Sequence, residues 1–208
     1  STEETRYYLN GIYFHKNDAG ALAAVATDGH RLALTIMDMP AGAEHIPDII
    51  LPRKAVGEIR KMIGEEEGEV VINLSETRAA FSFGNVRLTS KLIDGSFPDY
   101  TRVIPKGNDK KVVLDTALFA AAVDRVSTIS ADKTKAVKLQ LSHNMLTLSA
   151  STSDASSASE EIEISYEAAD LEIGFNARYL LDIAKQVESD EMQIALSDPS
   201  SPSLISTP

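Results

Sequence analysis

The sequence predicts an α+β fold with two related domains, and three observations support this prediction. Residues 49–63 align without a gap on residues 173–187, so a strand-plus-helix segment occurs twice. Runs of β-branched and aromatic residues, separated by Gly, Asn, Asp and Pro, are typical of antiparallel strands. The length of 208 residues suits two domains, and a Pro- and Gly-containing stretch predicts their limits at 1–105 and 106–208.

In the first domain, antiparallel strands are expected between residues 6 and 37, starting with the β-rich run 7–14. Pro52 suits the first turn of a helix, and Gly64 suits its end. Three further strands are expected at 70–74, 79–83 and 86–92.

The second domain starts with a strand at 111–114, after which Asp115 or Thr116 can cap a helix that reaches residue 128. Strands follow at 137–141, 145–150 and 161–166, and the repeated segment returns at 171, with its helix aligned as far as Val187. The first domain has no counterpart of the strand and helix at 111–128. We therefore expect the chain to be a piece of a longer protein.

Composition narrows the class of protein. The apolar fraction of 43% allows each domain a core, and the lack of Cys excludes disulfides and thiolate metal sites. No apolar run approaches the length of a membrane span, so a cytoplasmic protein is expected. The net charge of −11 argues against nucleic acid only if the charges are mixed evenly, because a basic face can coexist with an acidic remainder.

Helical phase separates the charges of the repeated helix. At 100° per residue the apolar side chains of residues 53–63 share one arc, and the cations Arg53, Lys54, Arg60 and Lys61 share the opposite arc. Arg178 and Lys185 occupy the same polar arc of the second copy. An ordinary amphipathic helix with solvated cations remains an alternative, and the recurrence favours a surface for a polyanion. The helix at 116–128 differs, since its polar face carries Ala117, Ala120, Ala121 and Asp124.

No pattern of an enzyme is present. The chain has no phosphate-binding glycine loop, no His-Glu-x-x-His helix and no Gly-x-Ser-x-Gly elbow. His30, beside Asp28, fits a turn better than it fits a general base. We therefore expect no catalytic residue, no metal site and no cofactor.

Three long strings carry a family resemblance: residues 6–11 (RYYLNG), 26–33 (ATDGHRLA) and 90–100 (SKLIDGSFPDY). With these strings the sequence resembles the beta subunits of bacterial DNA polymerase III, the sliding clamps. The resemblance implies strand–helix–strand units with antiparallel sheets outside and helices on the inner face of a ring. It also implies a middle domain without its first strand and helix, and a C-terminal domain without its last strands and tail.

The resemblance further implies that two full-length subunits form a ring around duplex DNA without reading sequence. Replicative polymerase, clamp loader and other proteins would bind such a ring through linear peptides. Matching positions make Arg53 and Lys54 the first candidates for facing DNA, with Tyr7 and Tyr8 next. Lys61, Arg178 and Lys185 are candidates from helical phase.

The family's peptide pocket buries apolar side chains between the middle and C-terminal domains. The matching positions are Leu9, Thr27, Gly29, His30, Arg31, Leu32, Pro98, Arg102 and Val103. Another wall of that pocket belongs to the C-terminal tail. A peptide-docking adaptor that does not encircle DNA is the main alternative function, and a metal-dependent hydrolase is a more distant one.

Overall fold

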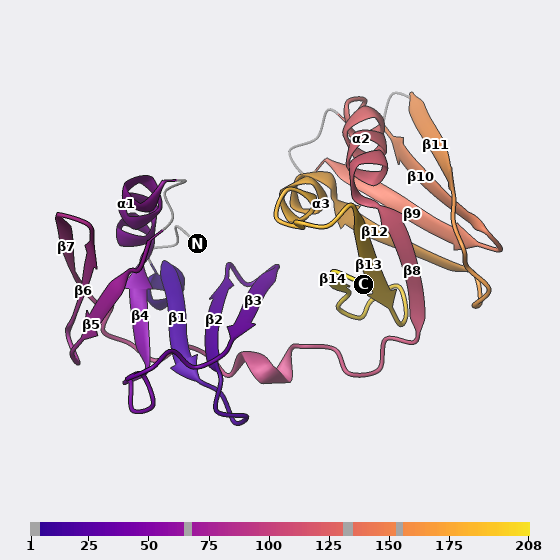
Figure 1. The fold of residues 1–208 in the computed structure, drawn as a ribbon. Helices are drawn as coiled ribbons and strands as arrows, with labels where there is room; N and C mark the ends of the chain where they lie inside the picture. The colour runs from indigo at the N-terminus through magenta and orange to yellow at the C-terminus, as the bar shows by residue number, and fades with distance from the viewer. Residues whose placement is uncertain (1–4, 65–67, 131–134, 153–155) are drawn as a thin grey trace. The chain divides into compact units, whose positions relative to one another are not determined.

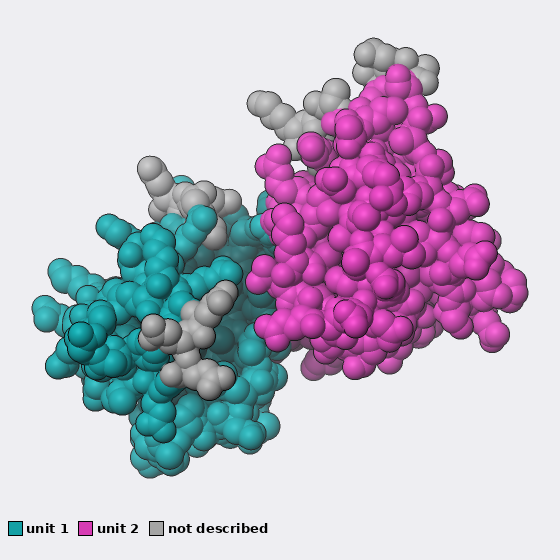
Figure 2. Space-filling model, turned by 45° about the horizontal axis from the view of Figure 1, so that its top comes forward, with its two compact units in different colours: residues 1–98 teal, residues 99–208 magenta. Residues whose placement is uncertain are grey.

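The computed structural model describes residues 5–64, 68–130, 135–152 and 156–208. The chain divides into two units, Ser1–Pro98 and Asp99–Pro208, which Figure 2 colours separately. This division lies a few residues before the predicted limit at 105. Each unit contains antiparallel sheets and helices, so the α+β fold is confirmed.

The first unit has two antiparallel sheets and one helix. Its larger sheet has the order β3-β2-β1-β4, and its smaller sheet the order β5-β6-β7. The strands are β1 (Gly11–Lys16), β2 (Leu22–Thr27), β3 (Leu32–Met37), β4 (Ile49–Pro52), β5 (Val71–Leu74), β6 (Arg78–Phe83) and β7 (Val86–Lys91). Helix α1 (Arg53–Ile63) follows β4 directly, and Figure 1 shows it alone over these sheets.

A small core joins α1 to both sheets. Leu51 of β4, Ala55 of α1, and Ala79 and Phe81 of β6 are buried together, and Phe14 and Ile59 pack against them. The helix is thus fixed to the sheets through one apolar stripe, which leaves its opposite face free.

The second unit has two helices. They pack against the strands of this unit, which form the sheet β11-β10-β9-β12 and the sheet β14-β13-β8. The strands are β8 (Lys110–Asp115), β9 (Ala136–Ser142), β10 (Met145–Ser151), β11 (Ser157–Glu163), β12 (Leu171–Asn176), β13 (Glu191–Leu196) and β14 (Leu204–Ser206). Helix α2 (Thr116–Ser127) follows β8, and α3 (Ala177–Ala184) follows β12. The two helices lie side by side (Figure 1).

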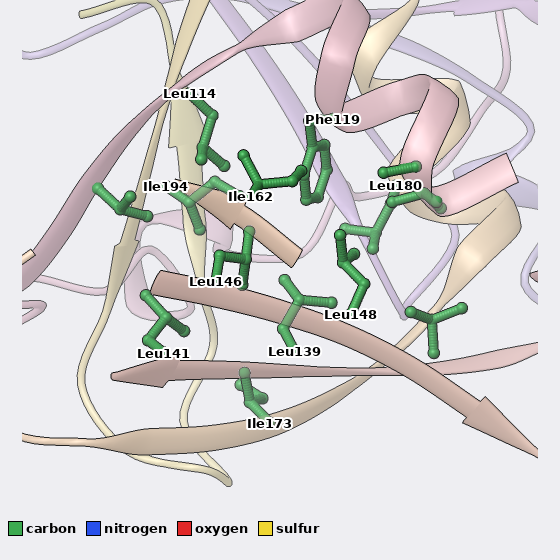
Figure 3. Close-up of a cluster of buried hydrophobic side chains, with 14 of the residues drawn as sticks. Leu114, Phe119, Leu139, Leu141, Leu146, Leu148, Ile162, Ile173, Leu180 and Ile194 are labelled. Atoms are coloured by element: carbon green, nitrogen blue, oxygen red, sulfur yellow. The ribbon is translucent and has the colours of Figure 1, made fainter. Parts of the chain in front are cut away.

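The core of the second unit is larger. Figure 3 shows Phe119 of α2 and Leu180 of α3 pointing toward leucines of β9 and β10, among them Leu139 and Leu148. Phe119 retains 1% of its accessible surface and Leu148 none.

The internal repeat extends beyond the segment that revealed it. Strands β1 to β4 recur in order as β9 to β12 with the same neighbours in the sheet, and the pair β5-β6 recurs as β13-β14. Helices α1 and α3 occupy the same place in this order. The predicted duplication is therefore a duplication of sheet topology.

Three predictions of local structure are wrong, and the first concerns β11, which covers Ser157–Glu163 rather than 161–166 because it pairs along its whole length with β10. Residues 7–14 do not form one strand, because Tyr7–Leu9 is a 3₁₀ turn and β1 begins at Gly11. Backbone hydrogen bonds from Leu9 to Arg6 and from Asn10 to Tyr7 close that turn, and local closure outweighs the β propensity of the aromatic residues. Helix α3 ends at Ala184 rather than at Val187.

Candidate nucleic-acid and peptide interfaces

The cations of α1 stand at both ends of the helix. Arg53 and Lys54 occupy its first turn, where no acidic residue is present, and Arg60 and Lys61 occupy its last turn. Cations in the last turn suit the helix dipole, but cations in the first turn oppose it at a cost of about 0.3–1 kcal/mol each. Arg53 and Lys54 therefore do not stabilise the helix that carries them.

The two faces of α1 are those that helical phase predicts. Ala55 is buried and Val56 and Ile59 are half-buried, whereas Arg53, Lys54, Arg60 and Lys61 are exposed. Phase did not predict one ion pair: Lys61 Nζ lies 3.1 Å from Glu58 Oε1, one turn away. Within the described ranges, the other three cations of α1 have no ion pair. Lys61 is thus the least available of the four.

Helix α3 presents its two cations in the same way. The Asn176 side chain accepts a hydrogen bond from Arg178 N at 2.9 Å and so caps the helix, while Leu180 is buried beneath it. Arg178 in the first turn and Lys185, the residue after the last turn, are both exposed.

Helix α2 has a different outer face. Asp115 caps it by accepting a hydrogen bond from Leu118 N at 2.7 Å, and Ala117 and Asp124 are exposed. Its one cation, Arg125, donates from Nε to Glu160 of β11 at 3.0 Å and makes a second, shorter contact through Nη2. These hydrogen bonds lower the pKa of Glu160. The charge of Arg125 is therefore already paired.

Tyr7 and Tyr8 lie in the 3₁₀ turn, next to the start of α1. Their rings pack edge to face with centroids 5.8 Å apart, and Tyr7 is 52% exposed. Asn10, which ends the turn, accepts a backbone hydrogen bond from Arg53 N at 2.9 Å. The aromatic pair and the cations Arg53 and Lys54 are thus held at the same end of α1.

The turn between β2 and β3 holds five of the candidate pocket residues. Thr27 Oγ1 donates to Arg31 O at 2.8 Å and accepts from Gly29 N, and the Asp28 carboxylate accepts from both His30 N and Arg31 N at 3.0 Å. Arg31 Nε also donates to Asp28 at 3.1 Å. The turn presents Gly29 and His30 as exposed and leaves Thr27, Arg31 and Leu32 half-buried.

Asp28 is the centre of this hydrogen-bond network. Burial alone would raise the pKa of its carboxyl group, but the hydrogen bonds from His30 and Arg31 together with the guanidinium charge hold that pKa below its ordinary value. Asp28 is therefore ionised at neutral pH and fixes the shape of the turn.

Arg6 is a residue that sequence reasoning missed. Gly29 has a φ of +87°, and a Cβ atom built there would lie 2.6 Å from Arg6 Nη1. The guanidinium group of Arg6 thus lies against the turn, and the Arg6 carbonyl accepts from Leu9 N at 2.9 Å. Leu9 itself is 4% exposed, so its side chain belongs to the interior of the first unit. Arg6 is the first residue of the string 6–11 that carries the family resemblance, and this was the sequence signal that could have suggested it.

The remaining pocket candidates lie where the chain passes from the first unit to the second. Pro98 ends the first unit and is exposed. Arg102 ends the short 3₁₀ turn η2 (Tyr100–Arg102) of the second unit, and Val103, next to it, is 57% exposed. Leu9 and the Thr27–Leu32 turn therefore belong to the first unit, whereas Arg102 and Val103 belong to the second unit.

Nowhere in the described ranges do three His, Cys, Asp or Glu side chains gather closely enough to hold a metal ion. None of the helices there combines the length and apolarity that crossing a bilayer requires.

Solved structures with the same fold are DNA polymerase sliding clamps. A *Caulobacter crescentus* beta sliding clamp matches with a TM-score of 0.96 at 49% identity over 100% of this chain and 56% of that one. A *Bartonella birtlesii* DnaN sliding clamp bound to griselimycin matches with a TM-score of 0.93 at 55% identity, over 99% of this chain and 56% of that one. The fold is thus that of a DNA clamp.

Sequence relatives narrow the class to one family. The model of the DNA polymerase III beta subunit central domain matches residues 1–99, and that of its C-terminal domain matches residues 101–208. The beta sliding clamp of *Caulobacter vibrioides* is 50% identical over 100% of the chain, and that of *Pseudomonas aeruginosa* 39% identical over 98%. The chain belongs to the DNA polymerase III beta subunit family, and it spans 57% and 55% of these two relatives.

Proposed function

We propose that this chain is the central and C-terminal part of a bacterial sliding clamp, a non-enzymatic processivity factor that encircles duplex DNA in the cytoplasm. The full-length protein forms a homodimeric ring. The ring tethers the replicative polymerase, the clamp loader and other DNA-processing proteins. A closed ring raises the effective concentration of a tethered enzyme without any base recognition.

The observation that carries the proposal is the duplicated cationic face of α1 and α3. Arg53 and Lys54 oppose the dipole of their own helix and have no ion pair in the described part of the chain, so their charge is available to a polyanion. In a chain of net charge −11, such cations restrict attraction for phosphates to the surface that bears them.

The mechanism requires weak, mobile contacts. A few cations that neutralise phosphates hold the duplex without specifying sequence, because phosphates carry no base information. The proposed DNA-facing residues are Tyr7, Tyr8, Arg53, Lys54, Lys61, Arg178 and Lys185. Tyr7 adds exposed aromatic surface beside the cations of α1, and the half-buried Tyr8 packs against its ring.

The proposed peptide pocket uses the rigid Thr27–Leu32 turn. Its backbone is fixed by hydrogen bonds to Thr27 and Asp28, so binding a linear peptide does not require the turn to become ordered. The residues assigned to the pocket are Leu9, Thr27, Gly29, His30, Arg31, Leu32, Pro98, Arg102 and Val103.

Topological tethering is tested with the full-length protein. The clamp loader places it on nicked circular DNA and on the same DNA after linearisation, and gel filtration measures retention. Retention on circular but not on linear DNA is expected, because a ring leaves only over an end. Equal retention on both would reject encirclement.

The rigid Thr27–Leu32 turn also supports the alternative function, a peptide-docking adaptor, because a peptide pocket does not require DNA. The triple variant Arg53→Ala, Lys54→Ala, Lys61→Ala separates the two functions. A clamp loses loading and processive synthesis while it keeps peptide affinity. If the protein is an adaptor, the triple variant keeps its loading and processive synthesis as well as its peptide affinity.

A further inference from the structure

A cavity of about 240 Å³ lies in the first unit, where its two sheets meet. Ile49 and Ile50 of β4 form one side, and the segment after β7 forms the other. Two backbone hydrogen bonds, from Ile93 N to Ile50 O and from Leu92 N to Thr77 O, both 2.9 Å, fix that segment. The lining residues are Tyr13, Asp48, Ile49, Ile50, Glu76, Leu92, Ile93, Gly95, Ser96 and Phe97.

One wall of the cavity is aromatic and rigid. Tyr13 stacks on Phe97 with ring centroids 4.8 Å apart and planes 9° apart, and His15 stacks on Tyr13 at 4.7 Å. Tyr13 Oη donates to Asp48 Oδ2 at 2.8 Å. The wall is therefore held both by stacking and by a hydrogen bond, so a ligand would meet it already formed.

Two carboxylates complete the cavity. Asp48 precedes β4, Glu76 lies in the turn between β5 and β6, and both are exposed. Neither forms an ion pair with a cation of the described ranges, and no Lys or Arg lines the cavity. Its charge is thus negative and uncompensated, above a floor of buried isoleucines.

We propose that this cavity binds an arginine side chain of a partner polypeptide. The volume lies below the roughly 300 Å³ at which pockets for drug-sized ligands begin, so a single long side chain suits it. An aliphatic stem can follow the apolar part of the lining, and the planar guanidinium group can contact the aromatic wall while it donates to carboxylates. A lysine matches the charge but lacks the planar group and the fixed fork of donors that a guanidinium group presents.

The site is separate from the surfaces assigned above. None of its lining residues belongs to the proposed DNA-facing set or to the proposed peptide pocket, although Phe97 directly precedes Pro98 in the chain. An arginine bound there would give a partner a second contact with the first unit. The proposal does not require DNA encirclement.

The test uses the 208-residue chain and capped tripeptides, Ac-Gly-Arg-Gly-NH₂ and its citrulline and lysine counterparts, in NMR titrations of backbone amides. The arginine peptide should shift the amides of Asp48, Glu76 and Phe97 and reach saturation. Citrulline has the same shape without the charge and should bind about ten-fold more weakly. Lysine should bind about three-fold more weakly than arginine.

Matched variants decide whether the carboxylates are responsible. Glu76→Gln should weaken the arginine peptide about three-fold, and Asp48→Asn by a similar factor. Asp94→Asn removes the same charge from an exposed residue that does not line the cavity, and it should change nothing. Equal binding of citrulline, or equal affinity of the Glu76→Gln and Asp94→Asn variants, would overturn the proposal. Retention of full-length Glu76→Gln on circular DNA should be normal, so the two proposals fail separately.

Discussion

The two units combine the same succession of six strands with different numbers of helices. In the first unit α1 stands alone, and its buried cluster consists of Leu51, Ala55, Ala79 and Phe81. In the second unit α2 and α3 pack together over a core that includes Phe119, whose side chain is almost fully enclosed. Because buried apolar area drives folding, we expect the second unit to be more stable than the first.

The largest expected difference concerns this core. Phe119→Ala should lower the free energy of unfolding of the second unit by about 3–5 kcal/mol, because it leaves a cavity in a closely packed cluster. Phe81→Ala should cost the first unit less than about 3 kcal/mol, since the smaller cluster around Phe81 can collapse more easily. Urea unfolding followed by residue-resolved hydrogen exchange measures each unit. Equal losses would show that the cores are equivalent.

Helix caps sharpen the same comparison. Asp115 caps α2 and Asn176 caps α3 through their side chains, whereas Pro52 at the start of α1 has no side-chain cap. Asp115→Ala should destabilise the second unit by about 1 kcal/mol and leave the exchange of α1 amides unchanged. Asp115→Asn keeps the acceptor and is the matched control. An equal effect of both substitutions would rule out the cap as the cause.

A third comparison concerns the exposed cations of α1 and α3 and their effect on DNA association. In the full-length protein Lys54→Ala should weaken DNA association, and the slope of log affinity against log salt should fall in magnitude by about 0.9 because one phosphate contact is lost. Arg178→Ala should act similarly, and Lys61→Ala less, since Lys61 is paired with Glu58. Fluorescence anisotropy at several salt concentrations measures the slope. Lys91→Ala, an exposed cation of β7, is the control, and an equal effect of Lys91→Ala would contradict a specific face.

The smallest expected effect is a loss of stability of the β2–β3 turn at acidic pH. Because the pKa of Asp28 is lower in the folded protein than its ordinary 3.8, the ionised carboxylate stabilises the β2–β3 turn above pH 3.8. That contribution should disappear as the pH falls below 3.8 through the folded-state pKa, and the His30 and Arg31 amide resonances report it. The Asp28→Asn variant should lack this transition. A transition that persists in the variant would assign it to another group.

Much of the fold follows from local signals in the sequence. The limits of α1 were set by Pro52 and Gly64, and the start of α2 by Asp115, because these residues act on the backbone beside them. Helical phase gave the exposure of Lys54 and Arg178 because burial of a helix in one stripe has a fixed period. The alignment of the repeat predicted strand order that the structure extends to six strands.

What the sequence did not reveal depends on side chains that meet across the fold. The contact of Arg6 with Gly29 joins two segments that no periodic pattern links. The pairing of Lys61 with Glu58 depends on which rotamers the two side chains adopt. Tyr13, Asp48 and Phe97, which line the cavity, come from three separate segments of the chain, so no continuous stretch of sequence predicts it.

At Arg53, a substitution that stabilises helix α1 would conflict with the proposed contact with phosphates. An acidic residue in the first turn of α1 would agree with the helix dipole, so Arg53→Asp should raise the melting temperature by an amount equivalent to about 1 kcal/mol. The same exchange would place a negative charge where we propose that phosphates pass. A selection for thermostability alone would therefore act against the proposed function at this position, as expected where activity and stability favour different residues.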